Sequence, residues 1–243
     1  MRSRLPPIHR PSAWTALATG CAVALVVVAL AATPRVANVS VTGAHHLTAD
    51  AVKVASGLVG RPVFTTGTAD ARAALLQLPA LRDARVQISL PDAAHVDVVE
   101  RDAIGRWTIA GTDWLVDADG VVFLSRDPQS APQFRAVDDR DATRSCAAKG
   151  GGRCVDPAVV TGAFRLARIA SGELRADATK PDVRVDATQG LVVRSGAGWE
   201  IRFGTPDDLE RKLSNAKQQL SANPTRRLDY VDVRSPDHVV LFP

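Results

Sequence analysis

A long uncharged segment near the N-terminus constrains this chain more than any other feature. Residues 11–33 contain no Asp, Glu, Lys or Arg, and the 19 residues Trp14–Ala32 are predominantly apolar. As an α-helix this run would extend about 28 Å, close to the hydrocarbon thickness of a bilayer. The sequence therefore predicts a transmembrane signal-anchor helix at residues 13–33, preceded by a short tail at residues 1–12.

The charges that flank this segment predict its orientation. Arg2, Arg4 and Arg10 precede it, and the positive-inside rule keeps such residues in the cytoplasm. The alternative is a cleavable signal peptide with a small-residue cleavage site at Ala29-Leu30-Ala31. The apolar run is longer than the usual signal-peptide core of about 7–15 residues, which favours an uncleaved single-pass type II membrane protein. Both interpretations place the bulk of the chain on the extracytoplasmic side of the cell membrane.

The remainder of the chain is almost neutral. Of 30 Lys and Arg residues, three lie in the N-terminal tail, which leaves 27 basic against 26 acidic side chains. This balance argues against a nucleic-acid-binding surface. Aromatic residues make up only 5% of the chain, so we expect a core built mainly of Val, Leu, Ile and Ala.

Two of the three cysteines suggest a disulfide. Cys21 lies within the apolar segment, whereas Cys146 and Cys154 flank a glycine-rich stretch. In an oxidising compartment such a pair is expected to form a disulfide. A metal site is the alternative, but it would need a third and a fourth ligand and none is nearby. Residues 126–154, rich in Pro, Asp and Gly, are predicted to be a loop.

Residues 34–101 show the order strand, helix, helix, strand, strand. An alternating strand ends at Gly43, and Thr48 is placed to cap the first helix. The second helix is expected to begin near Thr68 or Asp70. The two final strands are expected at residues 84–88 and 95–100, so this part should form a small α+β domain.

Residues 102–243 suggest a second mixed α/β domain with an antiparallel sheet. Asp119-Gly120 favours a tight hairpin turn, and Asp156-Pro157 favours a helix start. Thr205-Pro206-Asp207-Asp208 resembles a capping box before an amphipathic helix, which two strands should follow. The other expected strands cover residues 114–117, 121–123, 183–185, 191–193, 199–203, 228–234 and 239–242.

Motifs that carry chemistry are scarce. Ser214-Asn215-Ala216-Lys217 matches the S-x-x-K of penicillin-binding proteins, but the partner motifs S-D-N and K-T-G are absent. The adjacent His45 and His46 follow a strand and are expected in a solvated loop. Carboxylates are numerous, yet no pattern nominates a pair for glycoside cleavage. We therefore expect no catalytic residues, no metal and no cofactor.

Several short stretches resemble known families. Val41-Thr42-Gly43 followed by Leu47–Val52 resembles the opening of a POTRA domain, a small docking module of envelope proteins. Together with the single predicted span, the chain resembles the FtsQ/DivIB family of bacterial division proteins. The stretches that carry this resemblance are Val98–Trp107, Leu115–Phe123, Ile201–Leu213 and Leu228–Arg234.

This resemblance implies a tail at residues 1–12, an anchor at 13–33, a POTRA domain at 34–101 and an FtsQ-type β domain at 102–243. It implies a non-enzymatic scaffold at the division septum that binds FtsB/FtsL (DivIC)-type proteins and contacts the septal synthase pair FtsW/FtsI. Exposed strand edges would supply the binding sites by β-augmentation. An envelope assembly or secretion factor, or a cell-wall enzyme accessory, is the alternative.

The resemblance also nominates contact residues on the two last strands. An equally plain interpretation places the two valines in the core and only their neighbours on the surface. The residues nominated for partner binding are Tyr230, Val231, Asp232, Val233, Arg234, Leu241 and Phe242.

Overall fold

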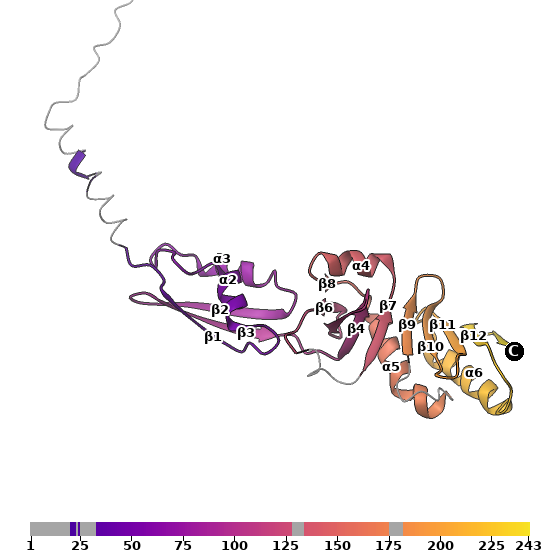
Figure 1. Cartoon of the computed structure of the whole chain (residues 1–243). Helices are drawn as coiled ribbons and strands as arrows, with labels where there is room; N and C mark the ends of the chain where they lie inside the picture. Colours follow the sequence, from indigo (N-terminus) through magenta and orange to yellow (C-terminus); the bar gives the residue numbers. More distant parts are fainter. Residues whose placement is uncertain (1–19, 23, 25–32, 128–133, 175–181) are drawn as a thin grey trace, which may run out of the picture.

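The computed structural model describes residues 20–22, 24, 33–127, 134–174 and 182–243 and contains two β-sheets. The first has three strands in the order β1-β3-β2, and the second has ten in the order β13-β12-β11-β10-β9-β7-β4-β5-β6-β8. Figure 1 shows them one after the other along an elongated molecule. We refer to the first sheet with α2 and α3 as the first sheet unit, and to the second with α4, α5 and α6 as the second sheet unit.

The predicted membrane segment, residues 13–33, lies almost entirely outside the described residues. Within the described part of the chain, no helix combines the length and the apolar character that a membrane crossing requires.

The first sheet unit confirms the predicted order of elements. β1 runs parallel to β3, and β3 is antiparallel to β2. Thr48 caps α2 as expected, because its side chain accepts a hydrogen bond from the Ala51 N–H. Fully buried Val52, Leu58 and Val96 join the helices to the sheet. The elements are β1 (Asn38–Thr42), α2 (Ala49–Ser56), α3 (Thr68–Leu75), β2 (Leu81–Ser89) and β3 (Ala93–Glu100).

The ten-stranded sheet is mixed, which corrects the expectation of an antiparallel sheet. The pairs β4–β7, β7–β9 and β11–β12 are parallel. Parallel neighbours need a crossover connection, and α5 and α6 lie in two of these crossovers. The strands are β4 (Gly105–Ile109), β5 (Thr112–Val116), β6 (Val121–Phe123), β7 (Arg135–Asp138), β8 (Gly152–Arg153), β9 (Asp182–Asp186), β10 (Gly190–Arg194), β11 (Glu200–Gly204), β12 (Tyr230–Ser235) and β13 (His238–Phe242). The helices are α4 (Asp141–Ala148), α5 (Pro157–Glu173) and α6 (Leu209–Ala222).

Two local predictions in this unit are wrong. The stretch predicted as a loop, residues 126–154, contains β7, α4 and β8. The expected capping box at Thr205 does not form, because α6 begins at Leu209 and its N-cap, Asp208, adopts a positive φ of 52°. A residue in that conformation cannot continue a right-handed helix toward Thr205. Instead, the Lys212 ammonium donates a hydrogen bond to the Thr205 carbonyl (2.9 Å) and closes the preceding bend.

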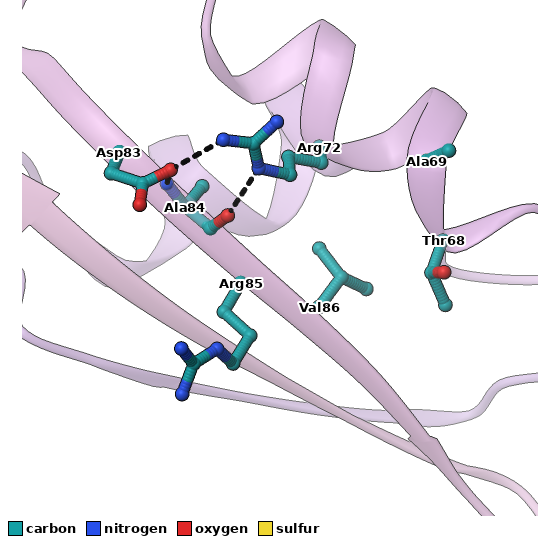
Figure 2. A pocket seen from close by; sticks show the side chains of 7 residues that line it. All are labelled: Thr68, Ala69, Arg72, Asp83, Ala84, Arg85 and Val86. Atoms are coloured by element: carbon teal, nitrogen blue, oxygen red, sulfur yellow. Dashed lines mark hydrogen bonds and ion pairs between the residues drawn. The ribbon is translucent and has the colours of Figure 1, made fainter.

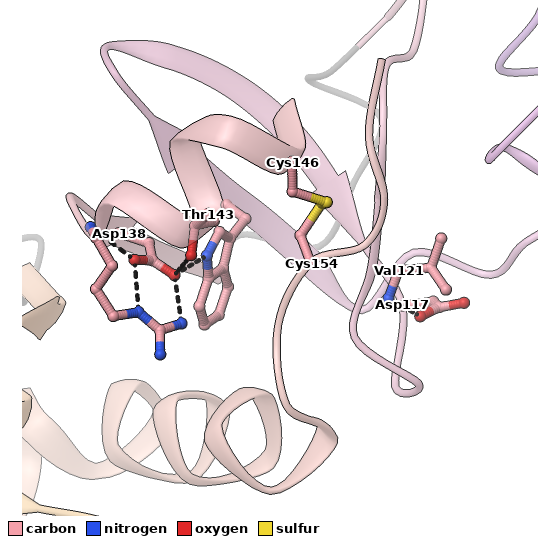
Figure 3. Close-up of a disulfide and its surroundings, with 8 residues drawn as sticks. Asp117, Val121, Asp138, Thr143, Cys146 and Cys154 are labelled. Atoms are coloured by element: carbon pink, nitrogen blue, oxygen red, sulfur yellow. Dashed lines mark hydrogen bonds and ion pairs between the residues drawn. A yellow bond between two sulfur atoms is a disulfide. The ribbon is translucent and has the colours of Figure 1, made fainter. Parts of the chain in front are cut away.

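A buried carboxylate organises the centre of the second sheet unit. Asp138, at the end of β7, is 0% exposed and accepts hydrogen bonds from the Trp107 indole N–H (3.0 Å) and the Thr143 hydroxyl (3.0 Å). The Arg140 guanidinium adds donors at 2.9 and 2.7 Å, and this bonding raises the pKa of Arg140. Figure 3 shows this carboxylate beneath α4. One side chain thus joins β4, β7 and α4.

The two sheet units meet at a packed joint. Leu115, Val121 and Phe123 form the second unit's side of a small apolar cluster that also contains Ala80. Beside it lies an ion pair between Arg101, which follows β3, and a carboxylate of the β5–β6 hairpin. We name this contact, which is formed by Ala80, Leu115, Val121, Phe123 and the Arg101–Asp117 ion pair, the joint.

The ion pair of the joint is almost enclosed. The Arg101 guanidinium lies 2.9 Å from Asp117, whose side chain is only 8% exposed. Asp117 also accepts hydrogen bonds from the N–H groups of Asp119 (3.0 Å) and Val121 (2.8 Å), which shapes the predicted hairpin turn. The same carboxylate therefore fixes the turn and connects it to the first sheet unit.

Candidate functional site

The nominated contact residues alternate between the core and the surface along β12. Val231 and Val233 are 0% exposed, so their side chains cannot line a contact with another chain, which corrects their nomination. Tyr230 and Asp232 are half-buried and Arg234 is exposed. This alternation follows from strand geometry, since successive side chains point to opposite faces of a sheet.

An aromatic stack crosses the exposed face of the last strands. The Tyr230 and Phe242 rings lie parallel, with centroids 5.1 Å apart and an interplanar angle of 7°. On the other side of Tyr230, the Arg202 guanidinium carbon lies 3.9 Å from the ring centroid, within range of a cation–π interaction. Glu200 accepts a hydrogen bond from Arg202 at 2.8 Å and holds it in place. These contacts pre-organise a flat, amphipathic surface.

A charged pair adjoins this stack. Arg234 donates to Asp232 through both its guanidinium (2.9 Å) and its backbone N–H (3.0 Å). Burial raises the pKa of Asp232, but the Arg234 hydrogen bonds and the charges of Arg234 and Arg202 outweigh it and bring the pKa below its usual range. The hydrogen bonds to Asp232 in turn raise the pKa of Arg234. Both groups are therefore ionised at neutral pH.

β13 is an edge strand. Among the described residues it pairs with β12 alone, so its other side presents backbone groups to solvent. Val240 and Phe242 are 50% and 49% exposed, while Val239 and Leu241 pack partly against the core. An edge of this kind can accept an added strand from another chain. We name β13 together with Tyr230, Arg202, Asp232 and Arg234 the C-terminal edge site.

The opposite end of the ten-stranded sheet is closed differently. β8 consists of two residues. The Cys146–Cys154 disulfide joins the residue that follows β8 to α4, and the two Cα atoms are 5.6 Å apart. Figure 3 shows the disulfide between α4 and the segment that leads to α5. Short edge strands are one way in which proteins block unwanted strand addition.

The remaining sequence motifs do not form a catalytic site. Ser214 is exposed on α6, and the Lys217 ammonium forms an ion pair with Glu173. His46 instead faces the joint, where its ring lies 3.2 Å from the Ser125 hydroxyl. In the described ranges, no group of three or more His, Cys, Asp or Glu side chains could hold a metal ion.

An open groove lies between α3 and β2 in the first sheet unit (Figure 2). Its charged groups are engaged with one another: Arg72 donates to the Asp83 carboxylate (2.7 Å) and to the Ala84 carbonyl (2.9 Å). The Arg72 hydrogen bond lowers the pKa of Asp83. Arg85 extends away from this pair in Figure 2.

Sequence reasoning missed Arg202 and Glu200 as members of the site. Their alternation with buried Ile201 and Phe203 indicated only that they face away from the core. What brings them to Tyr230 and Asp232 is the parallel register of β11 and β12, which pairs Glu200 with Tyr230 and Arg202 with Asp232. No local pattern reports that register.

The comparisons with known proteins first define a class. Residues 35–101 match the family model of the FtsQ-type POTRA domain. The relatives matched are called cell division protein FtsQ. The chain is therefore similar to FtsQ cell division proteins over most of its length.

The similarity to individual relatives is moderate but extended. The Chloroflexus aurantiacus protein is 31% identical over 181 residues, which cover 74% of this chain and 64% of that protein. The Chloroflexus aggregans protein is 29% identical over 201 residues, with 82% and 71% covered. The Zymomonas mobilis protein is 31% identical over 103 residues, 42% of this chain and 33% of the relative. The chain thus spans just under two thirds of the length of the Chloroflexus aurantiacus relative.

Proposed function

We propose that this chain is a non-enzymatic, bitopic membrane scaffold of the bacterial divisome that binds its partners by β-augmentation. In this proposal residues 1–12 are a cytoplasmic tail, 13–33 the anchor, 34–101 the POTRA domain and 102–243 an FtsQ-type β domain. The bulk of the chain lies outside the cytoplasm at the division septum. The FtsQ-type POTRA match and the similarity to FtsQ cell division proteins support this role.

One observation carries the binding part of the proposal: β13 is an edge strand flanked by a pre-organised aromatic and charged surface. An added strand gains affinity from main-chain hydrogen bonds and selectivity from side chains that contact Tyr230 and Arg234. We assign this edge to an FtsB/FtsL (DivIC)-type coiled-coil partner. Contacts with the septal synthase pair FtsW/FtsI complete the proposed coordination of septal peptidoglycan synthesis.

A new negative charge on the exposed face should weaken partner binding. Tyr230→Glu removes the stacked ring, and Arg234→Glu places a second carboxylate beside Asp232. Because truncation of a central interface aromatic or arginine commonly costs 2 kcal/mol or more, we expect at least about a tenfold loss of affinity for an FtsB-like partner. Co-purification and titration with the full chain measure this loss.

Ser214→Glu is the matched control, since Ser214 is exposed on α6 and lies outside the C-terminal edge site. The control should bind like the unmodified chain. Circular dichroism should show all three variants folded. Unchanged affinity in folded Tyr230→Glu and Arg234→Glu would exclude this face from the contact.

A proline scan of β13 tests strand addition itself. Along an edge strand the N–H groups point alternately to the neighbouring strand and to the open side. Proline at Val239, Val240 and Leu241 in turn should therefore abolish binding at alternate positions. Where the replaced N–H points to the open side, the hydrogen bonds between β12 and β13 should stay intact. Amide hydrogen exchange of the β12 N–H groups can verify this. Equal binding by all folded proline variants would show that the partner contacts only side chains.

A further inference from the structure

Three large apolar side chains are exposed at one end of the first sheet unit. Phe64 and Val59, in the connection between α2 and α3, are 66% and 61% exposed. Leu90, in the turn between β2 and β3, is 67% exposed. They belong to different loops, and neither the C-terminal edge site nor the joint uses them.

Backbone hydrogen bonds hold both loops against residues 34–38. The Val63 N–H donates to the Pro34 carbonyl (2.9 Å), and the Gly60 N–H to the Val36 carbonyl (2.8 Å). The N–H groups of residues 37 and 38 donate to the Asp92 carbonyl at 2.8 and 3.2 Å. Phe64, Val59 and Leu90 are thus each within two residues of a group bonded to this short segment.

This segment is also where the chain leaves the predicted anchor. Pro34 directly follows residues 13–33, and in Figure 1 the chain enters the first sheet unit at the end away from the second. A chain ordered from residue 34 onward cannot carry these loops far from the bilayer, because one extended residue spans at most about 3.6 Å. If residues 13–33 cross the membrane, the apolar side chains face its surface.

The charges around these side chains suit an anionic lipid surface. Arg35 and Arg61 are both exposed, and the Arg35 guanidinium donates to the Gly60 carbonyl at 2.9 Å. Residues 51–69 contain no Asp or Glu. Two acids lie near this end: Asp92, whose carboxylate accepts a hydrogen bond from the Asn38 amide, and Asp70, in the first turn of α3. Exposed apolar side chains among basic ones are typical of proteins that lie in the membrane interface.

We infer that Val59, Phe64 and Leu90, with Arg35 and Arg61, form a membrane-docking tip that rests in the lipid interface beside the anchor. The inference depends on the anchor of the proposed function. Docking adds a second contact with the bilayer, so the first sheet unit stands in a defined orientation instead of pivoting on residue 33. The tip is separate from the edge that we assign to protein partners.

Site-specific fluorescence in vesicles tests this tip. The full chain with Cys21→Ser and Phe64→Cys is labelled with an environment-sensitive dye under non-reducing conditions, which preserve the Cys146–Cys154 disulfide. It is reconstituted in phosphatidylcholine vesicles with and without phosphatidylglycerol. Lipids with a nitroxide near the headgroup should quench the dye, and more so when phosphatidylglycerol is present.

Val99→Cys is the matched control, because Val99 is 54% exposed in the same unit but lies near the other end of β3. Val99 is six residue steps beyond Ala93, which places it about 20 Å farther along the strand. Its dye should escape quenching. Leu90→Cys is an independent reporter of the tip, which should be quenched even if Phe64→Cys perturbs its own loop.

Replacing one basic residue measures how much its charge contributes to docking. A single Lys or Arg near an anionic surface contributes about 1 kcal/mol, so Arg61→Gln should lower the docked-to-undocked ratio about fivefold in phosphatidylglycerol vesicles. The variant should have little effect in phosphatidylcholine alone. A tip covered by protein instead of lipid would give a blue-shifted dye that nitroxide lipids do not quench, and would overturn the inference.

Alkaline carbonate extraction separates the inference from the anchor on which it depends. A chain that stays in the membrane while positions 64 and 90 remain unquenched would overturn the docking tip and leave the anchor standing. A chain that carbonate releases from the vesicles would overturn both. Retention together with quenching at both positions, but not at position 99, supports the tip.

Discussion

Replacement of Asp138 by alanine is expected to destabilise the folded chain by about 3–5 kcal/mol, because it removes the fully buried member of an ion pair, which is also the acceptor of two buried hydrogen bonds. The Trp107 indole N–H, the Thr143 hydroxyl and the Arg140 guanidinium would all lose their acceptor. Each lies at the junction of β4, β7 and α4. Urea denaturation of the full chain in detergent, monitored by tryptophan fluorescence, measures the change in the free energy of unfolding.

The neighbouring residue offers a matched control. Asp139 carries the same carboxylate, but its side chain is 51% exposed and its ion pairs with Arg184 (3.6 Å) and Arg144 (3.9 Å) are long. Asp139→Ala should change the stability by less than about 1 kcal/mol, as is usual for surface ion pairs. Equal loss in the two variants would show that burial of the Asp138 network does not determine its contribution.

The second large effect is expected at the joint. Asp117→Ala should cost about 2–3 kcal/mol, because the Arg101 guanidinium and two backbone N–H groups of the hairpin turn lose a nearly buried acceptor. The loss should weaken the coupling between the two sheet units. We therefore expect denaturation to separate into two transitions, one for each unit.

Asp119→Ala is the control for this experiment, since Asp119 lies in the same turn but is exposed. It should retain the cooperativity of the unmodified chain. Arg101→Ala should resemble Asp117→Ala, and the double variant should cost less than the sum of the two single variants. Additive losses would mean that the ion pair does not couple the units.

Local patterns were sufficient for most of the element order. The Thr48 cap and the Asp156-Pro157 helix start each depend on residues that are adjacent in sequence, and the structure confirms them. The hairpin at Asp119-Gly120 also forms, but of these two residues only Gly120 has a positive φ (77°). In these cases a few neighbouring side chains satisfy the backbone groups of a turn or a helix end. The first sheet unit could therefore be predicted almost in full.

The elements that were missed depend on distant contacts. β7 and α4 are short and lack a clear apolar period, and they are stabilised by contacts with distant residues: Asp138 binds Trp107 of β4, and the disulfide links Cys146 to Cys154. The candidate site shows the same limit, because Tyr230, Phe242 and Arg202 come together only through strand pairing. Pairing of this kind fixes neighbours that no single stretch of sequence specifies.

The unequal ends of the ten-stranded sheet have a consequence for stoichiometry. One end is a five-residue strand, and the other is a two-residue strand beside a covalent crosslink. Such a sheet can be extended at one edge and not at the other. It therefore accepts a single guest strand and cannot seed a polymer of its own copies. We therefore expect assemblies built on this sheet to be closed and of defined size, with one partner strand per copy of the chain.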